Sequence, residues 1–169
     1  MTMTITQAKQ STRRHQTRTA VIAALALSTA IANPAIACDK GAVTTVEKIY
    51  KVYVDDGIVN QMAPEIYSPR LQPIVKNWNT RCEANIELEG CILDGDFFID
   101  GNDYKISKLK VSCLSGDSSR SRVLVKFRNF DVPSTKVFDM VKDGDRWFID
   151  AIADGIDGKD FLGEIFKVP

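Results

Sequence analysis

Histidine is almost missing from this chain: the one residue of its type is His15, close to the N-terminus. Imidazole is the commonest general base near neutral pH and a frequent zinc ligand, so residues 38–169 lack the usual partner of a nucleophilic serine or cysteine. The carboxylates do not replace it, because Asp94-Gly95-Asp96 is not followed by the third ligand of a calcium loop. The sequence therefore predicts no metal and no cofactor, and it favours a protein that is not an enzyme.

A surplus of positive charge is missing too. The chain has a formal net charge of zero, but four of its 22 basic residues and none of its 22 acidic residues lie in residues 1–37. Residues 38–169 therefore carry a net charge of about −4. A nucleic-acid-binding domain would show a basic excess on one face. We expect no nucleic-acid partner, and charge alone would not draw this region to an anionic membrane.

Long apolar runs are also missing: the apolar stretch at residues 20–32 is rich in alanine and short for a membrane span. It follows three arginines and precedes small residues at the spacing that signal peptidase reads, which predicts a signal peptide over residues 1–37. Cleavage after Ala32 or after Ala37 fits the pattern, and an uncleaved anchor is the alternative. Residues 38–169 have the length of a single domain, which we expect in the periplasm.

Three stretches carry apolar residues at the intervals of three and four that are typical of a helix. The first covers residues 43–56, and the second covers residues 69–80 with Ser68 as its N-cap. A short third helix is expected over residues 157–166. Before the sheet, residues 96–100 are expected to form a short extended segment.

Four stretches alternate between apolar and polar residues, with the period of two that is typical of a half-buried strand. They are residues 104–114, 121–130, 135–142 and 146–152. Broken alternation at Ser107-Lys108 predicts a bulge, and Asp131–Pro133 and Asp143–Asp145 are the expected turns. Pairing in chain order would give one antiparallel sheet and, with the segregated helices, an α+β domain. The side chains expected to be buried together are Val123, Val125, Phe127, Trp147 and Ile149.

Several segments carry a family resemblance, in this order: Tyr67–Leu71, Asp96–Asp103, Phe127–Phe130, Phe138–Val141 and Arg146–Ile152. In order and spacing they resemble the bacterial family called domain of unknown function 3828 (DUF3828), over residues 43–166. Members of that family are exported or lipid-anchored envelope proteins. The family resembles the nuclear-transport-factor-2-like fold, so the resemblance implies a curved antiparallel sheet wrapped around N-terminal helices into a cone with a pocket. It implies no reaction.

Four cysteines allow two interpretations of the N-terminus. An even number in an exported domain predicts two disulfide bonds, with Cys82 paired to Cys91 across a short loop and Cys38 left to Cys113. Alternatively, Ala35-Ile36-Ala37-Cys38 is an acceptable lipobox, and Cys38 would then anchor the chain to a membrane through a lipid. In that case Cys113 would be a lone thiol. The only membrane contact that we expect is this one, through the N-terminus.

Aromatic and acidic residues provide the candidates for a binding pocket. Most of the aromatic ones follow a helix or strand period and belong to the core, although one or two could line a pocket mouth. Asp139 and Asp150 lie within strands beside aromatic residues, where a carboxylate facing an apolar pocket could act as a general base. The alternative is that both face solvent or form salt bridges with Arg128 or Arg146. The pocket candidates are Tyr50, Tyr53, Trp78, Asp139, Trp147 and Asp150.

Two classes of function follow. The first is a non-catalytic binding module of the cell envelope, with an unknown protein or small molecule as partner; an immunity or inhibitor protein for a periplasmic effector belongs here. The second is a small-molecule enzyme that uses an Asp-lined pocket of the cone. A deep pocket with convergent aspartate and tyrosine would favour the enzyme, whereas a filled cone with an exposed apolar patch would favour a protein partner.

Overall fold

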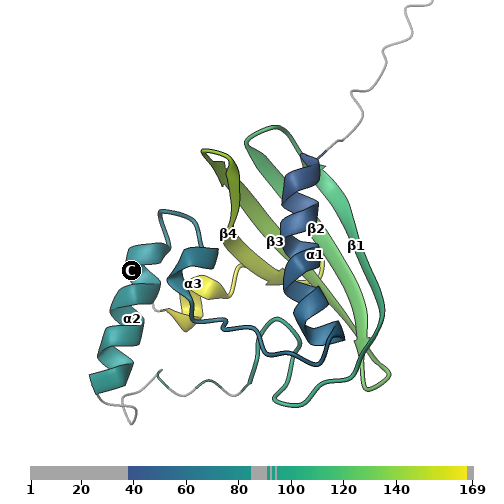
Figure 1. Cartoon of the computed structure of the whole chain (residues 1–169), viewed down its shortest axis with the longest axis horizontal. Helices are drawn as coiled ribbons and strands as arrows, with labels where there is room; N and C mark the ends of the chain where they lie inside the picture. The colour runs from purple at the N-terminus through teal and green to yellow at the C-terminus, as the bar shows by residue number, and fades with distance from the viewer. Residues whose placement is uncertain (1–37, 85–90, 92, 94, 167–169) are drawn as a thin grey trace, which may run out of the picture. The chain divides into compact units, whose positions relative to one another are not determined.

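The computed structural model describes residues 38–84, 91, 93 and 95–166; the predicted signal peptide lies outside the described residues. The elements are α1 (Lys40–Val54), the 3₁₀ helix η1 (Pro64–Ile66), α2 (Gln72–Ala84), β1 (Ile106–Gly116), β2 (Arg120–Asn129), β3 (Val132–Asp143), β4 (Arg146–Asp154) and α3 (Leu162–Ile165). The strands form one curved antiparallel sheet in the order β1-β2-β3-β4 (Figure 1). The expected α+β class and strand order are confirmed.

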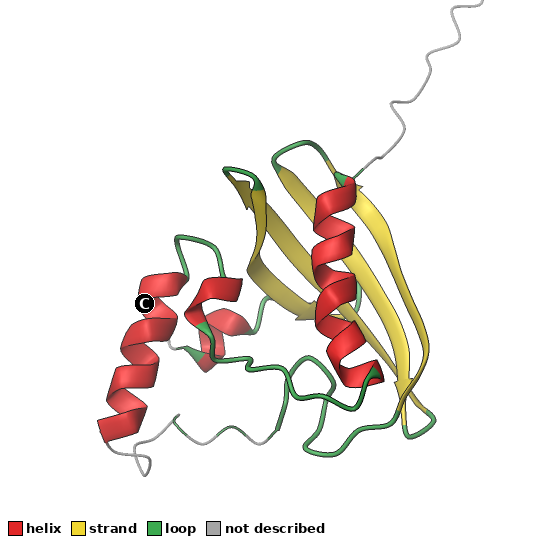
Figure 2. Ribbon diagram, viewed as in Figure 1, coloured by secondary structure: helices red, strands yellow, loops and turns green. Residues whose placement is uncertain are grey.

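The core lies between α1 and one face of this sheet. Alternation along β2 places Val123, Val125 and Phe127 on that face, where all three are buried. Cross-strand pairing sets Val123 opposite Phe138, so β3 presents an apolar residue to the same face. Trp147 and Ile149 of β4 join the same buried cluster, as predicted. Helix α1 crosses this face and contacts all four strands (Figure 2).

The hairpin turns differ from the expected ones in one place. Phe130 and Asp131 alone connect β2 to β3, and β3 already begins at Val132, so the predicted turn over 131–133 is wrong. Pro133 pairs with Arg128 of β2, while β4 reaches β3 only at Lys136. The missing N–H of this proline therefore leaves no gap in the sheet ladder. The predicted bulge in β1 is confirmed by a register shift between Ser107 and Lys110.

The helix boundaries follow from capping groups that the periodicity did not reveal. Helix α1 begins three residues before the predicted position, because the Asp39 carboxylate accepts a hydrogen bond from Gly41 N at 2.7 Å. Helix α2 begins at Gln72, so Ser68 is not its N-cap; the Ser68 hydroxyl binds Asp150 instead, at 2.5 Å. Pro73 then lies in the first turn, where its missing N–H would have no helical partner.

The last helix is much shorter than residues 157–166. Only Leu162–Ile165 are helical, and the chain turns sharply at Gly158, where a Cβ atom would lie 2.1 Å from Asp154 O. Asp160 Oδ1 accepts hydrogen bonds from Leu162 N and Ile152 N, which ties α3 to the end of β4. Leu162 and Phe166 are buried, and the Phe166 ring packs against those of Tyr67 and Trp78.

Candidate functional site

Aromatic rings fill the space between the second half of α1 and the sheet. Tyr50 is fully buried, with its ring centroid 5.4 Å from that of Phe127 and 6.0 Å from that of Phe138. Its hydroxyl donates to Phe98 O at 2.8 Å. Tyr53, one turn further along α1, is also buried. These two tyrosines therefore belong to the core, with their hydroxyls directed at protein acceptors.

A tight loop closes this end of the core; we call it the plug and define it as Asp96–Gly101. The expected extended segment at 96–100 is wrong, because Asp96 N bonds Gly101 O at 3.0 Å and the chain turns within four residues. The Asp96 carboxylate bends the loop further by accepting from Phe98 N at 2.8 Å. Phe98 packs between Tyr50 of α1 and Phe138 of β3, and both Phe98 and Ile99 are almost wholly buried.

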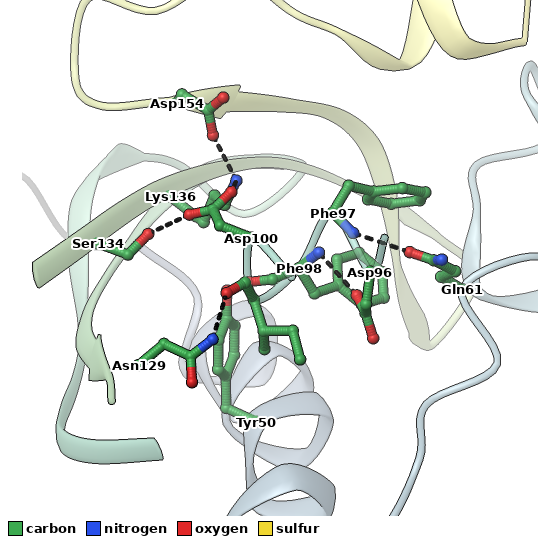
Figure 3. A network of polar contacts seen from close by, with 11 residues as sticks. Tyr50, Gln61, Asp96, Phe97, Phe98, Asp100, Asn129, Ser134, Lys136 and Asp154 are labelled. Atoms are coloured by element: carbon green, nitrogen blue, oxygen red, sulfur yellow. Dashed lines mark hydrogen bonds and ion pairs between the residues drawn. The ribbon is translucent and has the colours of Figure 1, made fainter. Parts of the chain in front are cut away.

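Lys136 fastens the plug to the sheet (Figure 3). Its side chain is 1% exposed, although it comes from β3 and faces the apolar core. The ammonium group forms ion pairs with Asp100 of the plug and with Asp154 at the end of β4, and it lies 5.2 Å from the ring centroid of Phe161. Ser134 adds a hydrogen bond to Asp100. Full pairing makes this lysine a structural clamp rather than a free nucleophile.

Asp96 and Tyr53 form an aspartate–tyrosine contact at this end. The tyrosine hydroxyl donates to Asp96 Oδ2. Burial raises the pKa of Asp96 above its ordinary value, although the hydrogen bonds from Tyr53 and Phe98 N act in the opposite direction. Burial, together with the hydrogen bond to Asp96, also raises the pKa of Tyr53, which keeps the phenol protonated. The contact is internal, because Tyr53 is 2% exposed.

An exposed apolar surface lies just outside the plug; we call it the hairpin tip and define it as Phe130, Asp131 and Val132. Phe130 is 56% exposed and Val132 is 65% exposed. Both turn residues adopt left-handed backbone conformations, with φ of 47° at Phe130 and 70° at Asp131. Beside the tip is a hollow of about 510 Å³, lined by Ile99, Asp100, Gly101, Asn102, Asp103, Asn129, Phe130, Val132, Pro133 and Ser134.

The two candidate aspartates lie together at a different place. Asp139 and Asp150 line a hollow of about 300 Å³ with Arg120 and Arg122. Arg122 sits directly across the strand pair from Asp139 and bonds it at 2.9 Å. The salt bridges expected with Arg128 or Arg146 do not form.

Asp150 occupies the irregular point of β4, where the register against β3 shifts. This irregularity brings its carboxylate to the residues that precede α2: Ser68 Oγ donates at 2.5 Å and Arg70 Nε lies 3.2 Å away. The backbone at this point is paired too, since Ser68 N donates to Ile149 O at 2.8 Å. Asp150 thus fastens the start of α2 to the sheet.

The two tryptophans are separated from these groups and from each other. Trp78 of α2 packs against Phe166, with ring centroids 6.1 Å apart, and lines a hollow beside Cys82 and Cys91. Trp147 lies under the first turn of α1 and lines a hollow with Lys40 and other residues of that helix. The six pocket candidates therefore do not converge on one site.

Lys136 and Phe130 were missed by the sequence reasoning. A signal for Lys136 existed: it alternates with Phe138 and Met140, which places it on the inner face of β3. No signal in the sequence distinguished Phe130, because the alternation pattern makes it the last residue of the predicted strand.

Both cysteine pairs form disulfide bonds, as the pairing hypothesis predicted. Cys38 and Cys113 have Cα atoms 5.5 Å apart, and Cys82 and Cys91 have Cα atoms 5.3 Å apart. With its sulfur bonded to Cys113, Cys38 has no thiol left to carry a lipid. Two disulfides indicate an oxidising, extracytoplasmic compartment.

In the described part of the chain, none of the helices is both long enough and apolar enough to span a bilayer. Within the same residues, histidine, cysteine, aspartate and glutamate form no group of three that could hold a metal ion.

A comparison of the chain with protein-family models, with curated proteins and with solved structures finds no match.

Proposed function

We propose that this chain is a non-catalytic binding module of the bacterial cell envelope, exported to the periplasm, and that it contacts a protein partner through the hairpin tip. We also propose that it belongs to the DUF3828 family and to the nuclear-transport-factor-2-like folds. A curved sheet with a helix across one face supports the fold proposal. The two disulfide bonds support the location.

The observation that carries the proposal is the exposed, left-handed phenylalanine at position 130. Two-residue turns with positive φ strongly prefer Asn-Gly, because asparagine and glycine tolerate this conformation. A bulky residue there costs on the order of 1 kcal/mol, and its exposed ring gains little from packing. The fold would be more stable with asparagine. A side chain that opposes folding and faces solvent is best explained by a contact with another molecule.

The surroundings of the tip suit a protein contact. Phe130 and Val132 lie at the rim of the hollow of about 510 Å³, which offers space for an apolar side chain of a partner. Asp103 and Asn102 add polar groups to the lining of the same hollow. An aromatic anchor beside a small hollow with a polar rim is the usual composition of a protein–protein hot spot. An immunity or inhibitor protein, which must grip a partner, would use such a surface.

The packed interior speaks against the enzyme alternative. An enzyme with this architecture would need an open space between α1 and the sheet, whereas Tyr50, Phe98 and Phe138 occupy it. The other candidate place for an active site is the hollow that Asp139 and Asp150 line. Both carboxylates there are held in ion pairs with arginines. If Asp139→Asn or Asp150→Asn abolished turnover of a substrate without lowering the melting temperature, the enzyme alternative would replace our proposal.

A photo-crosslinking experiment tests the contact. A benzophenone amino acid replaces Phe130 in one variant of the full chain and the similarly exposed Ile156 in a matched variant. Irradiation of cells that produce each variant should give one discrete adduct from position 130 and none from position 156. Adducts from neither position, or the same adducts from both, would refute the hairpin tip as the contact surface.

A stability measurement separates loss of contact from loss of fold. We expect Phe130→Asn to raise the free energy of unfolding by roughly 1 kcal/mol, because asparagine relieves the left-handed strain. The same variant, with the crosslinker placed at Val132, should lose the adduct. A variant that keeps the adduct would show that Phe130 is not the anchor.

A further inference from the structure

A group of exposed lysines lies close to the hairpin tip, in β2 and in and just before β1. We call it the lysine strip and define it as Lys105, Lys108, Lys110 and Lys126, all of which are exposed. Lys105 O accepts a hydrogen bond from Phe130 N at 3.3 Å, so the chain that enters β1 lies directly against the tip. The positive charge is local, because residues 38–169 as a whole carry more acidic than basic residues.

Two lysines of the strip face each other across a strand pair. Pairing between β1 and β2 sets Lys110 directly opposite Lys126. Because the neighbouring Val125 is buried in the core, alternation places Lys126, and with it Lys110, on the sheet face away from α1. Like charges in such positions destabilise a strand pair. On the same face of β2, Arg122 stands opposite Asp139 and bonds it at 2.9 Å, which is the stabilising arrangement.

The lysine strip has no acidic partner in the described part of the chain. Among the described residues, none of its four ammonium groups forms an ion pair, and the only carboxylate bonded to a neighbouring cation is that of Asp131. Its distance to Arg128, which shares a face with Lys126, is 3.9 Å, and the Asp131 side chain is 91% exposed. Such a pair contributes little and leaves both groups hydrated. An acidic surface could therefore approach the strip without breaking a strong ion pair.

The backbone at Lys108 is unfavourable in the same way as at Phe130. Lys108 occupies the register shift of β1 between Ser107 and Lys110, and its φ of 51° is left-handed. This conformation costs any residue with a Cβ atom stability, and glycine would adopt it more easily. The fold thus retains a long cationic side chain where it is not needed for packing, since Lys108 is exposed.

Protection of the sheet edge explains only part of this arrangement. β1 is an edge strand, and lysines and bulges on an edge strand discourage pairing with another chain. β2 lies between β1 and β3, so Lys126 and Arg128 protect no edge. A contact across the outer face of the sheet accounts for the cations of both strands.

We infer that the partner of the hairpin tip is an acidic protein, whose carboxylates lie over the lysine strip while its apolar surface meets Phe130. This inference rests on the hairpin tip being the contact surface. Phe130 follows Lys126 by four residues, about 13 Å along a strand, so both fit within one interface of ordinary size. The aromatic anchor provides affinity, and the lysines accelerate association and favour one orientation of the partner.

Acidic residues at the tip favour a protein over an anionic membrane. Asp131 lies between the two apolar residues of the tip, and Asp103 lines the hollow beside it. Insertion of Phe130 into a membrane would bring Asp131 to the level of the anionic head groups, which repel it. A protein carries discrete carboxylates, which can lie over the lysine strip and leave Asp131 uncovered.

Reversal of a single charge tests whether the strip is required. In the full chain with the benzophenone amino acid at position 130, Lys126→Glu should lower the adduct yield about tenfold or more, because it replaces an attraction by a repulsion. The new glutamate faces Lys110 and should raise the melting temperature, so unfolding would not explain the loss. The control Lys76→Glu makes the same charge change at an exposed position of α2 and should leave the adduct yield unchanged.

Carbodiimide coupling tests the acidity of the partner without a substitution in the strip. The reagent joins a lysine amine to a contacting carboxylate as an amide, and it becomes a urea by taking up the water that this condensation releases. Applied to the adduct from position 130, it should link Lys110 or Lys126 to an aspartate or glutamate of the partner, which mass spectrometry identifies. Lys76 should form no such link.

The outcomes separate this inference from the proposed contact. If position 130 gives no adduct in the otherwise unchanged chain, the contact surface is refuted and the inference with it. An adduct of equal yield in Lys126→Glu and Lys76→Glu, or one whose lysine strip couples to no partner carboxylate, would retain the contact and overturn the acidic partner. An adduct with the mass of a phospholipid would identify a membrane and would also overturn it.

Discussion

The two ends of the α1–sheet unit are held together by different forces. β3 runs from one end to the other, with Lys142 beside Asp39 at the end where α1 begins, which we call the basic end, and Val132 at the hairpin tip. At the basic end the chain is fastened covalently, since the Cys38–Cys113 bond ties the residues before α1 to β1. At the hairpin end the plug is fastened by ions and hydrogen bonds, through Lys136 and its two aspartates.

This difference follows from what each end must constrain. At the basic end, Cys38 lies two residues before α1, so its bond to Cys113 holds the start of the helix against β1. The plug is an internal loop with both of its ends already attached. A buried lysine is sufficient to select one conformation for it, at a desolvation cost that the ion pairs with Asp100 and Asp154 offset. The largest expected effects on stability therefore come from the disulfide and then from the lysine.

The disulfides should differ in their contribution to stability. Removing Cys38–Cys113 with a double alanine variant opens a loop with a sequence separation of 75, against 9 for Cys82–Cys91. On the chain-entropy model the losses are about 4.5 and about 2.5 kcal/mol. Urea unfolding of the two double variants measures them. Equal losses would mean that loop closure does not explain how the basic end is held.

Stepwise reduction provides a check that needs no substitution. Cys113 is exposed, whereas Cys82 and Cys91 are both buried. Reductant should therefore reach the Cys38–Cys113 bond first. Alkylation followed by mass spectrometry should label Cys38 and Cys113 earlier than the other pair; the reverse order would contradict the assigned burial.

The clamp at the hairpin end should respond asymmetrically to substitution. Asp100→Asn/Asp154→Asn leaves the Lys136 ammonium buried without a counter-charge, which costs about 3–5 kcal/mol of unfolding free energy. Lys136→Met leaves two carboxylates that are 48% and 68% exposed and remain hydrated, so we expect a loss of less than about 2 kcal/mol.

An exposed pair serves as the control for the clamp. Lys51→Met breaks the surface pair with Asp55 and should change the free energy of unfolding by about 0.5 kcal/mol or less. Chemical denaturation of the three variants gives the ranking. A Lys136→Met variant that is less stable than the double asparagine variant would contradict the expected asymmetry, because methionine keeps most of the lysine stem and lacks only the ammonium group.

The sheet could be predicted because its information is local. Alternation along β2 and the Asp-Gly turn before β4 depend on neighbouring residues only, and both predictions are confirmed. The plug could not be predicted from the sequence, because a single contact between its two ends, Asp96 and Gly101, defines it. Without that contact, Asp96 resembles the first residue of an aromatic strand. The start of α2 failed for the same reason, since the distant Asp150 takes the Ser68 hydroxyl.

The candidate surfaces were harder to foresee than the fold. Chemistry makes aromatic residues such as Tyr50 candidates for a pocket, but their burial depends on packing between elements that are far apart in sequence. Phe130 matters because of a backbone angle that periodicity does not report. The cysteine pairing was the exception, because four cysteines leave few arrangements.

Acid should affect the two ends in opposite directions, the smallest of the expected effects. At the basic end, the hydrogen bond from Gly41 N lowers the pKa of Asp39, so its contribution to stability is present above about pH 4 and is lost as pH falls through the lowered value. At the hairpin end, burial raises the pKa of Asp96. The folded chain takes up a proton at Asp96 more readily than the unfolded chain does, so the contribution of Asp96 to stability becomes more favourable as pH falls from the raised value towards about 4.

Comparing the unfolding free energy of the unchanged chain with those of Asp39→Asn and Asp96→Asn between pH 7 and pH 3 isolates each group. On acidification, the unfolding free energy of the unchanged chain should fall relative to that of Asp39→Asn. It should rise relative to that of Asp96→Asn. If both differences changed in the same direction, the two ends would not differ in their electrostatics.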